Sequence, residues 1–314
     1  MGVVFARLLP PKFRPERDIP DLSGKTIIVT GGNTGIGYET VKQLLRKNAK
    51  VYLAARSPEK TTAAIKELEE ETKKSAIFLQ LDLVDLPAVR RAAEAFLSRD
   101  SKLDILFNNG GVMISPPDLL TAQNYDLQFG TNVIGHFFLT ELLLPALTKS
   151  FEESKVPARV IHTSSQGHAF APEYGLAFES LKGGRERDAW VKKTGNWKRF
   201  CMASKLGNII ISNHFAKAHS DVLVSCSLHP GSIKSELQRH VVGWLQVIGN
   251  ALLFPLRALG AYTQLWAATV ASPAQINGKY LVPWGKIGKA DKRASSTKLE
   301  GETIAYIREQ IKDY

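Results

Sequence analysis

Cysteine is scarce in this sequence, because its 314 residues include only Cys201 and Cys226. Two isolated cysteines supply neither a disulfide framework nor the ligand spacing of a metal site, so we expect a reducing compartment, the cytoplasm, and no bound metal. The sequence also lacks a run of about 18 apolar residues, the length that a membrane-spanning helix needs. Near its start, no continuous apolar stretch leads to a cleavage site, and Ala6 breaks the myristoylation pattern. We therefore predict neither an export signal nor a lipid anchor.

Long blocks of one charge sign are also absent. The 41 Lys and Arg residues outnumber the 30 Asp and Glu residues and give a net charge of +11, but the two signs are interspersed. This distribution argues against a nucleic-acid partner. A positive surface instead favours an anionic cofactor or an acidic membrane surface. An apolar fraction of 44% in a chain of this length is sufficient for one large folded domain.

Short apolar runs alternate with helix-like segments along most of the sequence. The runs are continuous, which is typical of parallel strands that are buried on both faces. The pattern predicts an α/β fold, a single doubly wound parallel sheet (Rossmann fold) with helices on both faces. The predicted strands are 26–29, 50–55, 76–81, 103–107, 159–163, 222–228 and 279–282. The predicted helices include 58–74, 119–147 and 198–219. We predict three parts: an N-terminal extension 1–22, a dinucleotide-binding sheet domain 23–290 and a C-terminal helical tail 291–314.

The stretch 30–37, Thr-Gly-Gly-Asn-Thr-Gly-Ile-Gly, follows the first predicted strand and opens a helix. Glycines in such a turn let the backbone approach a pyrophosphate, and the free N–H groups of the first helical turn point at the anion. The residues predicted to hold the phosphate groups are Gly31, Asn33, Thr34, Gly35, Ile36 and Gly37. Thr40 stands where the dinucleotide fingerprint has its third glycine, so the turn alone fits an ordinary strand–helix connection equally well.

Polar residues follow the next three predicted strands, at the edge where parallel sheets bind ligands. Arg56 lies nineteen residues after Gly37, where NAD-binding folds place an acidic residue for the ribose hydroxyls. A guanidinium suits the 2′-phosphate of NADP instead, although a solvated surface side chain explains Arg56 as well. Asp82 is predicted to accept from an adenine amino group, and the backbone at Gly110 to pass close to a ribose. The other residues predicted at this edge are Leu83, Asn108 and Asn109. Ordinary turn chemistry also explains the Asn-Gly pair.

The order of these motifs resembles that of the short-chain dehydrogenase/reductase family. The matching elements are Thr-Gly-x3-Gly-x-Gly at 30–37, Asn-Asn-x-Gly at 108–111, Asn132, Ser164-Ser165, Ser204-Lys205 and Pro230-Gly231. The resemblance covers residues 22–290, and its long gap between Ser165 and Lys205 is similar to the branch of retinol dehydrogenases and WW-domain oxidoreductases. It implies NADP(H) as the cofactor and a hydride transfer that interconverts an alcohol and a carbonyl. The further cofactor contacts that it implies are Lys205, Pro230, Gly231, Ile233 and Ser235.

The resemblance also assigns four catalytic positions, which fall on Asn132, Ser165, Cys201 and Lys205. In the mechanism that it implies, Ser165 hydrogen-bonds the substrate oxygen and Asn132 holds a water in a proton relay. Lys205 binds the nicotinamide ribose and lowers the pKa of a tyrosine four residues earlier, which exchanges a proton with the substrate. This sequence has Cys201 in the place of that tyrosine.

A thiol at position 201 changes what the chemistry requires. Its ordinary pKa of about 8.5 is below that of tyrosine, and we expect the neighbouring Lys205 to push it toward the thiolate. A thiol is shorter than a phenol and a weak hydrogen-bond donor, so it needs a bridging water or another hydroxyl, for which Tyr174 is a candidate. The alternative is an NADP-binding pseudoenzyme or sensor in which Cys201 is a small apolar filler. An epimerase or dehydratase that uses the same nicotinamide is a third hypothesis.

The apolar stretch 241–259 corresponds, in the resemblance, to the variable substrate lid of the family, which we place at 235–260. Its composition suggests a small lipophilic substrate, or contact with a membrane surface on the cytosolic side through the flanking Arg239 and Arg257. A helix buried in the core explains the same composition equally well. The sequence is compatible with both a monomer and a homo-oligomer.

Overall fold

The computed structural model describes residues 12–194, 199–231 and 257–314. Within these residues one eight-stranded sheet has the strand order β3-β2-β1-β4-β5-β6-β7-β8. The strands are β1 Thr26–Thr30, β2 Lys50–Ala55, β3 Ile77–Gln80, β4 Ile105–Asn108, β5 Ala158–Thr163, β6 Leu223–Leu228, β7 Tyr280–Val282 and β8 Lys286–Ile287. Neighbouring strands are parallel, except for β7 and β8. The predicted doubly wound parallel sheet is confirmed.

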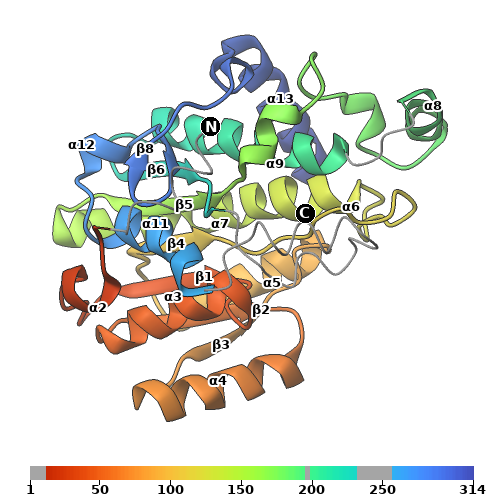
Figure 1. Cartoon of the computed structure of the whole chain (residues 1–314). Helices are drawn as coiled ribbons and strands as arrows, with labels where there is room; N and C mark the ends of the chain where they lie inside the picture. Colours follow the sequence, from red (N-terminus) through yellow and green to blue (C-terminus); the bar gives the residue numbers. More distant parts are fainter. Residues whose placement is uncertain (1–11, 195–198, 232–256) are drawn as a thin grey trace.

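Helices cover both faces of the sheet (Figure 1). The longer ones are α3 Gly35–Arg46, α4 Pro58–Thr72, α5 Leu86–Leu97, α7 Gly135–Ser154, α8 Arg185–Thr194, α9 Arg199–Ala218, α11 Arg257–Thr269 and α13 Thr297–Ile311. The shorter ones are α2 Pro15–Asp18, α6 Leu127–Phe129, α12 Pro273–Ile276, the π-helical η1 Gly130–Ile134 and the 3₁₀ helices η2 Gln166–Phe170, η3 Phe178–Ser180 and η5 Lys292–Ser295. One apolar core lies between the sheet and α5, α7, α9 and α13. A second core lies on the opposite face, under α3, α4 and α11.

The strand order reverses next to β1, and this reversal positions the site. The chain runs from β1 outward through β2 to β3, and then returns to β4 on the other side of β1. Doubly wound sheets bind their ligands at the carboxyl ends of the strands beside such a reversal. The segments at that point are the glycine turn 30–37 after β1 and the segment 108–111 at the end of β4. Both strands are buried along their whole length, in agreement with their apolar sequences.

The predicted helix 119–147 is wrong at both ends. Residues 119–126 are non-helical, and the helical backbone runs over 127–154 as α6, η1 and α7. The start is determined by Asp126, whose side chain accepts from two backbone N–H groups of the first turn, at 3.1 and 2.8 Å. The same buried carboxylate forms an ion pair with Arg187 of α8 at 2.9 Å. The helix therefore starts after a polar cap that a distant cation stabilises. Apolar spacing alone had placed its start earlier, at residue 119.

The other predicted elements occur with shifts of at most two residues at their ends. Strand β8 was not predicted, because two residues carry no periodicity. Within the predicted helical tail 291–314 the structure has η5 and α13, while the domain division itself stays a prediction. In the described ranges, no helix combines the length and the apolarity that crossing a lipid bilayer requires.

Candidate functional site

The glycine turn between β1 and α3 is too tightly closed for side chains at several of its positions. A Cβ atom on Gly37 would lie 2.2 Å from the carbonyl oxygen of Gly31. Gly31 has a φ of 64°, and a Cβ there would lie 2.9 Å from Cα of Gly110 at the end of β4. Gly35 has a φ of 59° and faces open space. Thr34 precedes α3 without a side-chain cap, so the first N–H groups of this helix are left for an anion such as a pyrophosphate.

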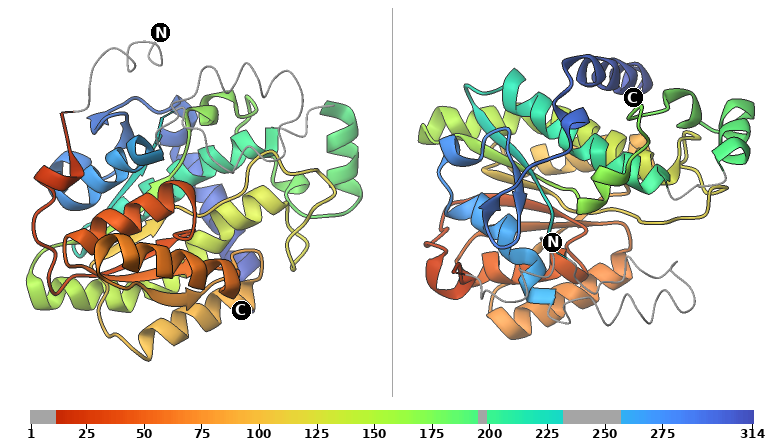
Figure 2. Two further views of the ribbon diagram at one scale, coloured as in Figure 1. Left: turned by 60° about the horizontal axis from the view of Figure 1, so that its bottom comes forward. Right: turned by 45° about the horizontal axis from the view of Figure 1, so that its top comes forward.

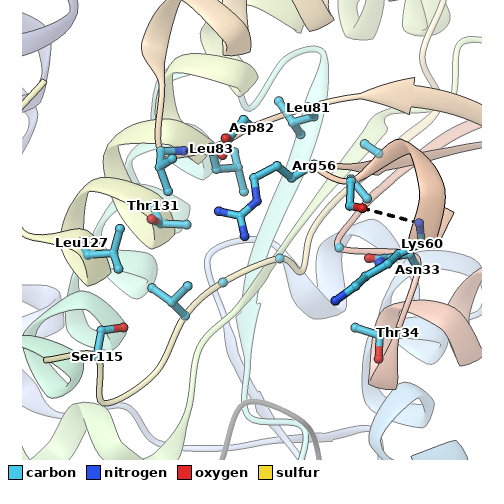
Figure 3. A pocket seen from close by; sticks show the side chains of 18 of the residues that line it. Asn33, Thr34, Arg56, Lys60, Leu81, Asp82, Leu83, Ser115, Leu127 and Thr131 are labelled. Carbon is cyan, nitrogen blue, oxygen red and sulfur yellow. Dashed lines mark hydrogen bonds between the residues drawn. The ribbon is translucent and has the colours of Figure 1, made fainter. Parts of the chain in front are cut away.

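A cavity of about 700 Å³ lies beside this turn, at the edge of the sheet (Figure 3). Its volume is in the range of about 300–1,000 Å³ that is usual for small-molecule sites. The predicted cofactor residues that line it are Gly31, Asn33, Thr34, Arg56, Asp82, Leu83 and Gly110. The structure therefore brings together residues from the ends of four strands that the sequence placed at one ligand.

Two cations line this cavity. Arg56 directly follows β2 and extends its guanidinium into the hollow, and Lys60 reaches it from the first turn of α4 (Figure 3). Ser57 caps α4 by accepting from the backbone N–H of Lys60 at 3.4 Å. The sequence prediction missed Lys60. Its signal is the Ser-Pro pair at 57–58, which starts a helix and places the third helical residue beside the end of β2.

Two asparagines at the end of β4 have different surroundings. Asn108 is 1% exposed, and its amide donates to the Thr140 hydroxyl at 3.0 Å inside the protein. Asn108 does not line the cavity and supports the sheet from inside, so its contact with the cofactor stays a prediction. Asn109 donates from Nδ2 to the Thr30 carbonyl oxygen at 2.9 Å, which holds the glycine turn against the end of β4.

The segment after β6 supplies the next part of the predicted cofactor site. Pro230 and Gly231 directly follow His229, whose N–H donates to the carbonyl oxygen of Leu281 on β7 at 2.9 Å. Gly231 has a φ of 100°, a conformation that favours glycine. The other residues predicted here, Ile233 and Ser235, lie outside the described residues. The predicted lid 235–260 also lies outside them, except for its last four residues, which begin α11.

A buried hydrogen-bond chain connects the glycine turn to Asn132. The Thr30 hydroxyl oxygen accepts from the N–H groups of Asn109 at 2.9 Å and Gly110 at 2.8 Å, which occupies both of its lone pairs. Its own proton has two acceptors within reach, the carbonyl oxygen of Phe107 at 3.1 Å and Nε2 of His136 at 2.9 Å. Nδ1 of His136 lies 3.0 Å from the Asn132 carbonyl oxygen, which only accepts. Nδ1 of His136 therefore carries a proton.

Burial keeps this histidine neutral. Desolvation lowers the pKa of His136 from 6.5 to about 4, and that of the nearby His162 from 6.5 to about 3. Protonation of either ring would place a charge in the interior of the protein, so the unfolded chain binds protons that the folded protein excludes. The free energy of unfolding is therefore highest above pH 6.5 and decreases as the pH falls toward the folded-state values.

We expect His136 alone to lower the free energy of unfolding by about 2 kcal/mol between pH 7 and pH 5, because one pKa unit corresponds to about 1.4 kcal/mol. His136→Gln keeps an amide for hydrogen bonding but cannot titrate, so it should reduce this pH dependence. The measurement is urea unfolding of both proteins at pH 7, 6 and 5. An equal pH dependence in the two proteins would contradict the exclusion of protons by His136.

Asn132 lies in the π-helical segment η1, a distortion that is frequent at functional sites. Its side-chain oxygen accepts from the Val112 N–H at 2.9 Å. Its amide donates to the Val112 carbonyl oxygen and to the Ser204 hydroxyl, both at 3.0 Å. Ser204 in turn donates to the Cys201 carbonyl oxygen at 2.8 Å. Through these bonds to Val112 and Ser204, the Asn132 side chain connects the segment after β4 to α9, which carries Cys201 and Lys205.

Cys201 and Lys205 are one turn apart on α9, on the same face of the helix. The Lys205 ammonium donates to the Thr163 carbonyl oxygen, at the end of β5, at 3.1 Å. Burial lowers the pKa of Lys205. Burial also raises the pKa of the Cys201 thiol, which is 4% exposed, and outweighs the opposite effect of the Lys205 charge. Lys205 thus acts in the expected direction, but the desolvation of the buried thiol is the larger effect and favours the protonated form.

Ser165 directly precedes η2, which packs against α9. Its hydroxyl oxygen accepts from the Gly167 N–H at 3.0 Å, and its own proton has no acceptor among the described residues. This proton is therefore left for a ligand. Tyr174, predicted as a substitute proton donor, is 55% exposed and accepts from the indole N–H of Trp190 at 3.0 Å. The structure thus pairs Tyr174 with α8 at the surface.

Comparison with known proteins places these features in context. Residues 25–184 match the sequence model of a family described as short chain dehydrogenase. A short-chain dehydrogenase/reductase of Armillaria gallica is 46% identical over 313 residues, which cover 99% of this chain and 98% of that protein. Retinol dehydrogenase 12 of Mus musculus is 35% identical over 82% of this chain and 78% of that protein. The NADPH-bound carbonyl reductase from chicken fatty liver shares the fold with a TM-score of 0.64 and 20% identity, over 86% of this chain and all of that one.

Proposed function

Because the chain belongs to the short-chain dehydrogenase/reductase family, we propose that it is an NADP(H)-dependent oxidoreductase that interconverts an alcohol and a carbonyl group. The observation that carries this proposal is the cavity where the glycine turn, Arg56 and Lys60 meet. The tight turn and the uncapped N-terminus of α3 fit a pyrophosphate, and two cations at the end of β2 fit the additional phosphate of NADP. Several solved structures of the same fold contain NADP or NADPH, which supports this choice.

The bound nicotinamide supplies or accepts the hydride, and the residues around β5 and α9 orient the reactants. Ser165 donates its free hydroxyl proton to the substrate oxygen, which polarises a carbonyl or holds an alcohol. Lys205 is fixed by its bond to Thr163 and has two further N–H groups for the hydroxyls of the nicotinamide ribose. Asn132 keeps α9 at a constant position relative to the cofactor edge of the sheet.

Cys201 is the residue that limits this chemistry. Its thiol is protonated and buried, and it is shorter than the tyrosine phenol that the family has at this position. A water that bridges the thiol and the substrate oxygen would complete the proton path. The same observation favours a second candidate function, an NADP(H)-binding protein without turnover. Both candidate functions share the cofactor site. They differ only in whether a proton can pass between position 201 and the substrate oxygen.

The substrate class is part of the proposal. The stretch 241–259 is rich in apolar residues and belongs to the segment where the family varies with its substrate. Two mouse relatives at 35% and 36% identity are named for retinol, a lipophilic alcohol. We therefore propose a small lipophilic alcohol or carbonyl compound as the substrate.

The proposal is tested by titrating the purified protein with NADPH and with NADH, followed by a turnover assay. The assay monitors NADPH oxidation with a panel of lipophilic aldehydes and ketones, and NADP⁺ reduction with the matching alcohols. We expect saturable binding with NADPH bound more tightly, and slow turnover with at least one lipophilic compound. NADPH binding without turnover on any of them would favour the second function. Absence of NADPH binding would contradict both.

A further inference from the structure

The loop that follows Ser165 is held by the distant segment 291–293. Nδ1 of His168 lies 2.7 Å from the carbonyl oxygen of Ser165, which only accepts, so the ring proton is on Nδ1. Nε2 is then an acceptor, and it receives the backbone N–H of Asp291 at 3.0 Å. The ring is 3% exposed and packs edge-on against Tyr280, with 4.8 Å between the ring centroids. One buried, neutral imidazole thus connects the backbone of Ser165 to that of Asp291.

Arg293 holds the same loop at a second place. Its guanidinium donates to the carbonyl oxygens of Ala169 at 3.0 Å and Ala171 at 2.6 Å, and also to that of Pro172. Its Nε donates to the Asp291 carboxylate at 2.7 Å, which orients the guanidinium plane. Three carbonyl groups within four residues therefore converge on one cation. The loop cannot change its course without breaking several charge-assisted hydrogen bonds. We call His168, Asp291 and Arg293 the C-terminal clamp.

The C-terminal clamp is attached to the helix that carries Cys201 and Lys205. The carbonyl oxygen of Ala294, next to Arg293, accepts from the Asn213 side chain of α9 at 2.9 Å. Ala294 is also part of the apolar core that α9 and α13 share. Figure 2 shows this C-terminal part of the chain, in dark blue, on the same side of the molecule as α9. The loop after Ser165 and the helix with Lys205 are thus fixed to one common support.

We propose that the C-terminal clamp positions Ser165 for its hydrogen bond to the substrate oxygen. The hydroxyl of Ser165 is bonded to the Gly167 N–H inside the clamped loop, so a displacement of the loop also moves the hydroxyl. A displacement of about 1 Å at a reacting group can cost about 100-fold in rate. The inference rests on the proposed function for its effect on turnover, but the effect on the loop is independent of it. Residues 291–293 lie outside the part of the chain that the family's sequence model matches.

The test compares Arg293→Gln with Arg308→Gln in the full-length protein. Arg308 lies on α13, pairs with Glu141 at 3.4 Å and is 55% exposed, so its substitution removes the same charge from the C-terminal part of the chain without touching the loop. We expect Arg293→Gln to accelerate amide hydrogen exchange of residues 166–171 by about tenfold or more. We also expect kcat to fall by about 10- to 100-fold while the Kd for NADPH stays within about twofold. Arg293→Lys keeps the charge but not the planar fork, so its values should be intermediate.

Turnover is measured in the natural protein and in the Cys201→Tyr background, and the loop exchange is measured in both. A Tm within a few degrees of the natural protein shows that the fold is intact; should Arg293→Gln not fold, Arg293→Lys takes its place. Loop exchange and kcat equal to those of Arg308→Gln would overturn the inference. Faster exchange with an unchanged kcat would overturn it as well, because the loop would then move without affecting Ser165. Loss of NADPH binding in the natural protein would contradict the proposed function instead, and the loop exchange would still decide whether the clamp holds the loop.

Discussion

Replacing Cys201 by tyrosine is expected to raise kcat by about 10²- to 10⁴-fold, the range over which a positioned general acid or base changes a rate. Position 201 lies one turn before Lys205 on the same face of α9, so a phenol there lies beside the ammonium, which favours its ionised form. A phenol also reaches further than a thiol and is a stronger hydrogen-bond donor. The measurement is kcat of the natural protein and of Cys201→Tyr with NADPH and the same lipophilic carbonyl compounds.

This substitution also adds a ring at a position that is 4% exposed. Overpacking of this kind costs about 1–3 kcal/mol, so we expect a lower Tm for Cys201→Tyr. Cys201→Phe is the matched control, because it adds the same ring without the hydroxyl and should lower Tm without a gain in kcat. Equal kcat values for the Tyr and Phe variants would show that a missing hydroxyl does not limit turnover. Turnover that survives in Cys201→Ala would show that the thiol is not the proton carrier.

The sheet and its ligand edge were predictable from the sequence for a physical reason. A strand that is buried on both faces needs an uninterrupted apolar run, and β1 and β4 have such runs. The turn after β1 was predictable because its close backbone contacts leave no room for a Cβ, as at Gly37. These features depend on residues that are close in the sequence, so local sequence patterns are sufficient to predict them.

Features that depend on distant partners were not predictable. The buried cap Asp126 is stabilised by Arg187, which lies 61 positions later, so apolar spacing alone misplaced the start of the helix. The protonation of Cys201 depends on how deeply α9 is buried, whereas the sequence shows only that Lys205 is near. His168 and Asp291 are 123 positions apart, and their bond uses a backbone N–H that every residue except proline carries. The residue type at position 291 therefore does not indicate such a contact.

The second large effect concerns the cofactor end of the site. Replacing both Arg56 and Lys60 by alanine is expected to weaken NADPH binding by about 10²- to 10³-fold and to leave NADH binding within about threefold. A hydrogen bond to a charged group contributes about 10- to 100-fold in affinity, and the two cations are less than additive because they bind one phosphate. The two side chains line the same cavity at the end of β2, and they are the cationic residues of its lining. The measurement is the Kd of each cofactor for the natural protein, both single variants and the double variant.

The control is Lys66→Ala, which removes a positive charge from the exposed side of α4 without touching the cavity. Arg56 and Lys60 are themselves exposed, so salt screens their attraction for the phosphate, and NADPH binding should weaken between low and high salt in the natural protein. In the double variant the same change of salt should affect NADPH and NADH equally, because the charges that distinguish them are gone. If the natural protein bound NADH as tightly as NADPH, Arg56 would not select the 2′-phosphate of NADP. An equal loss for both cofactors in the double variant would mean instead that the two side chains shape the turn rather than select the phosphate.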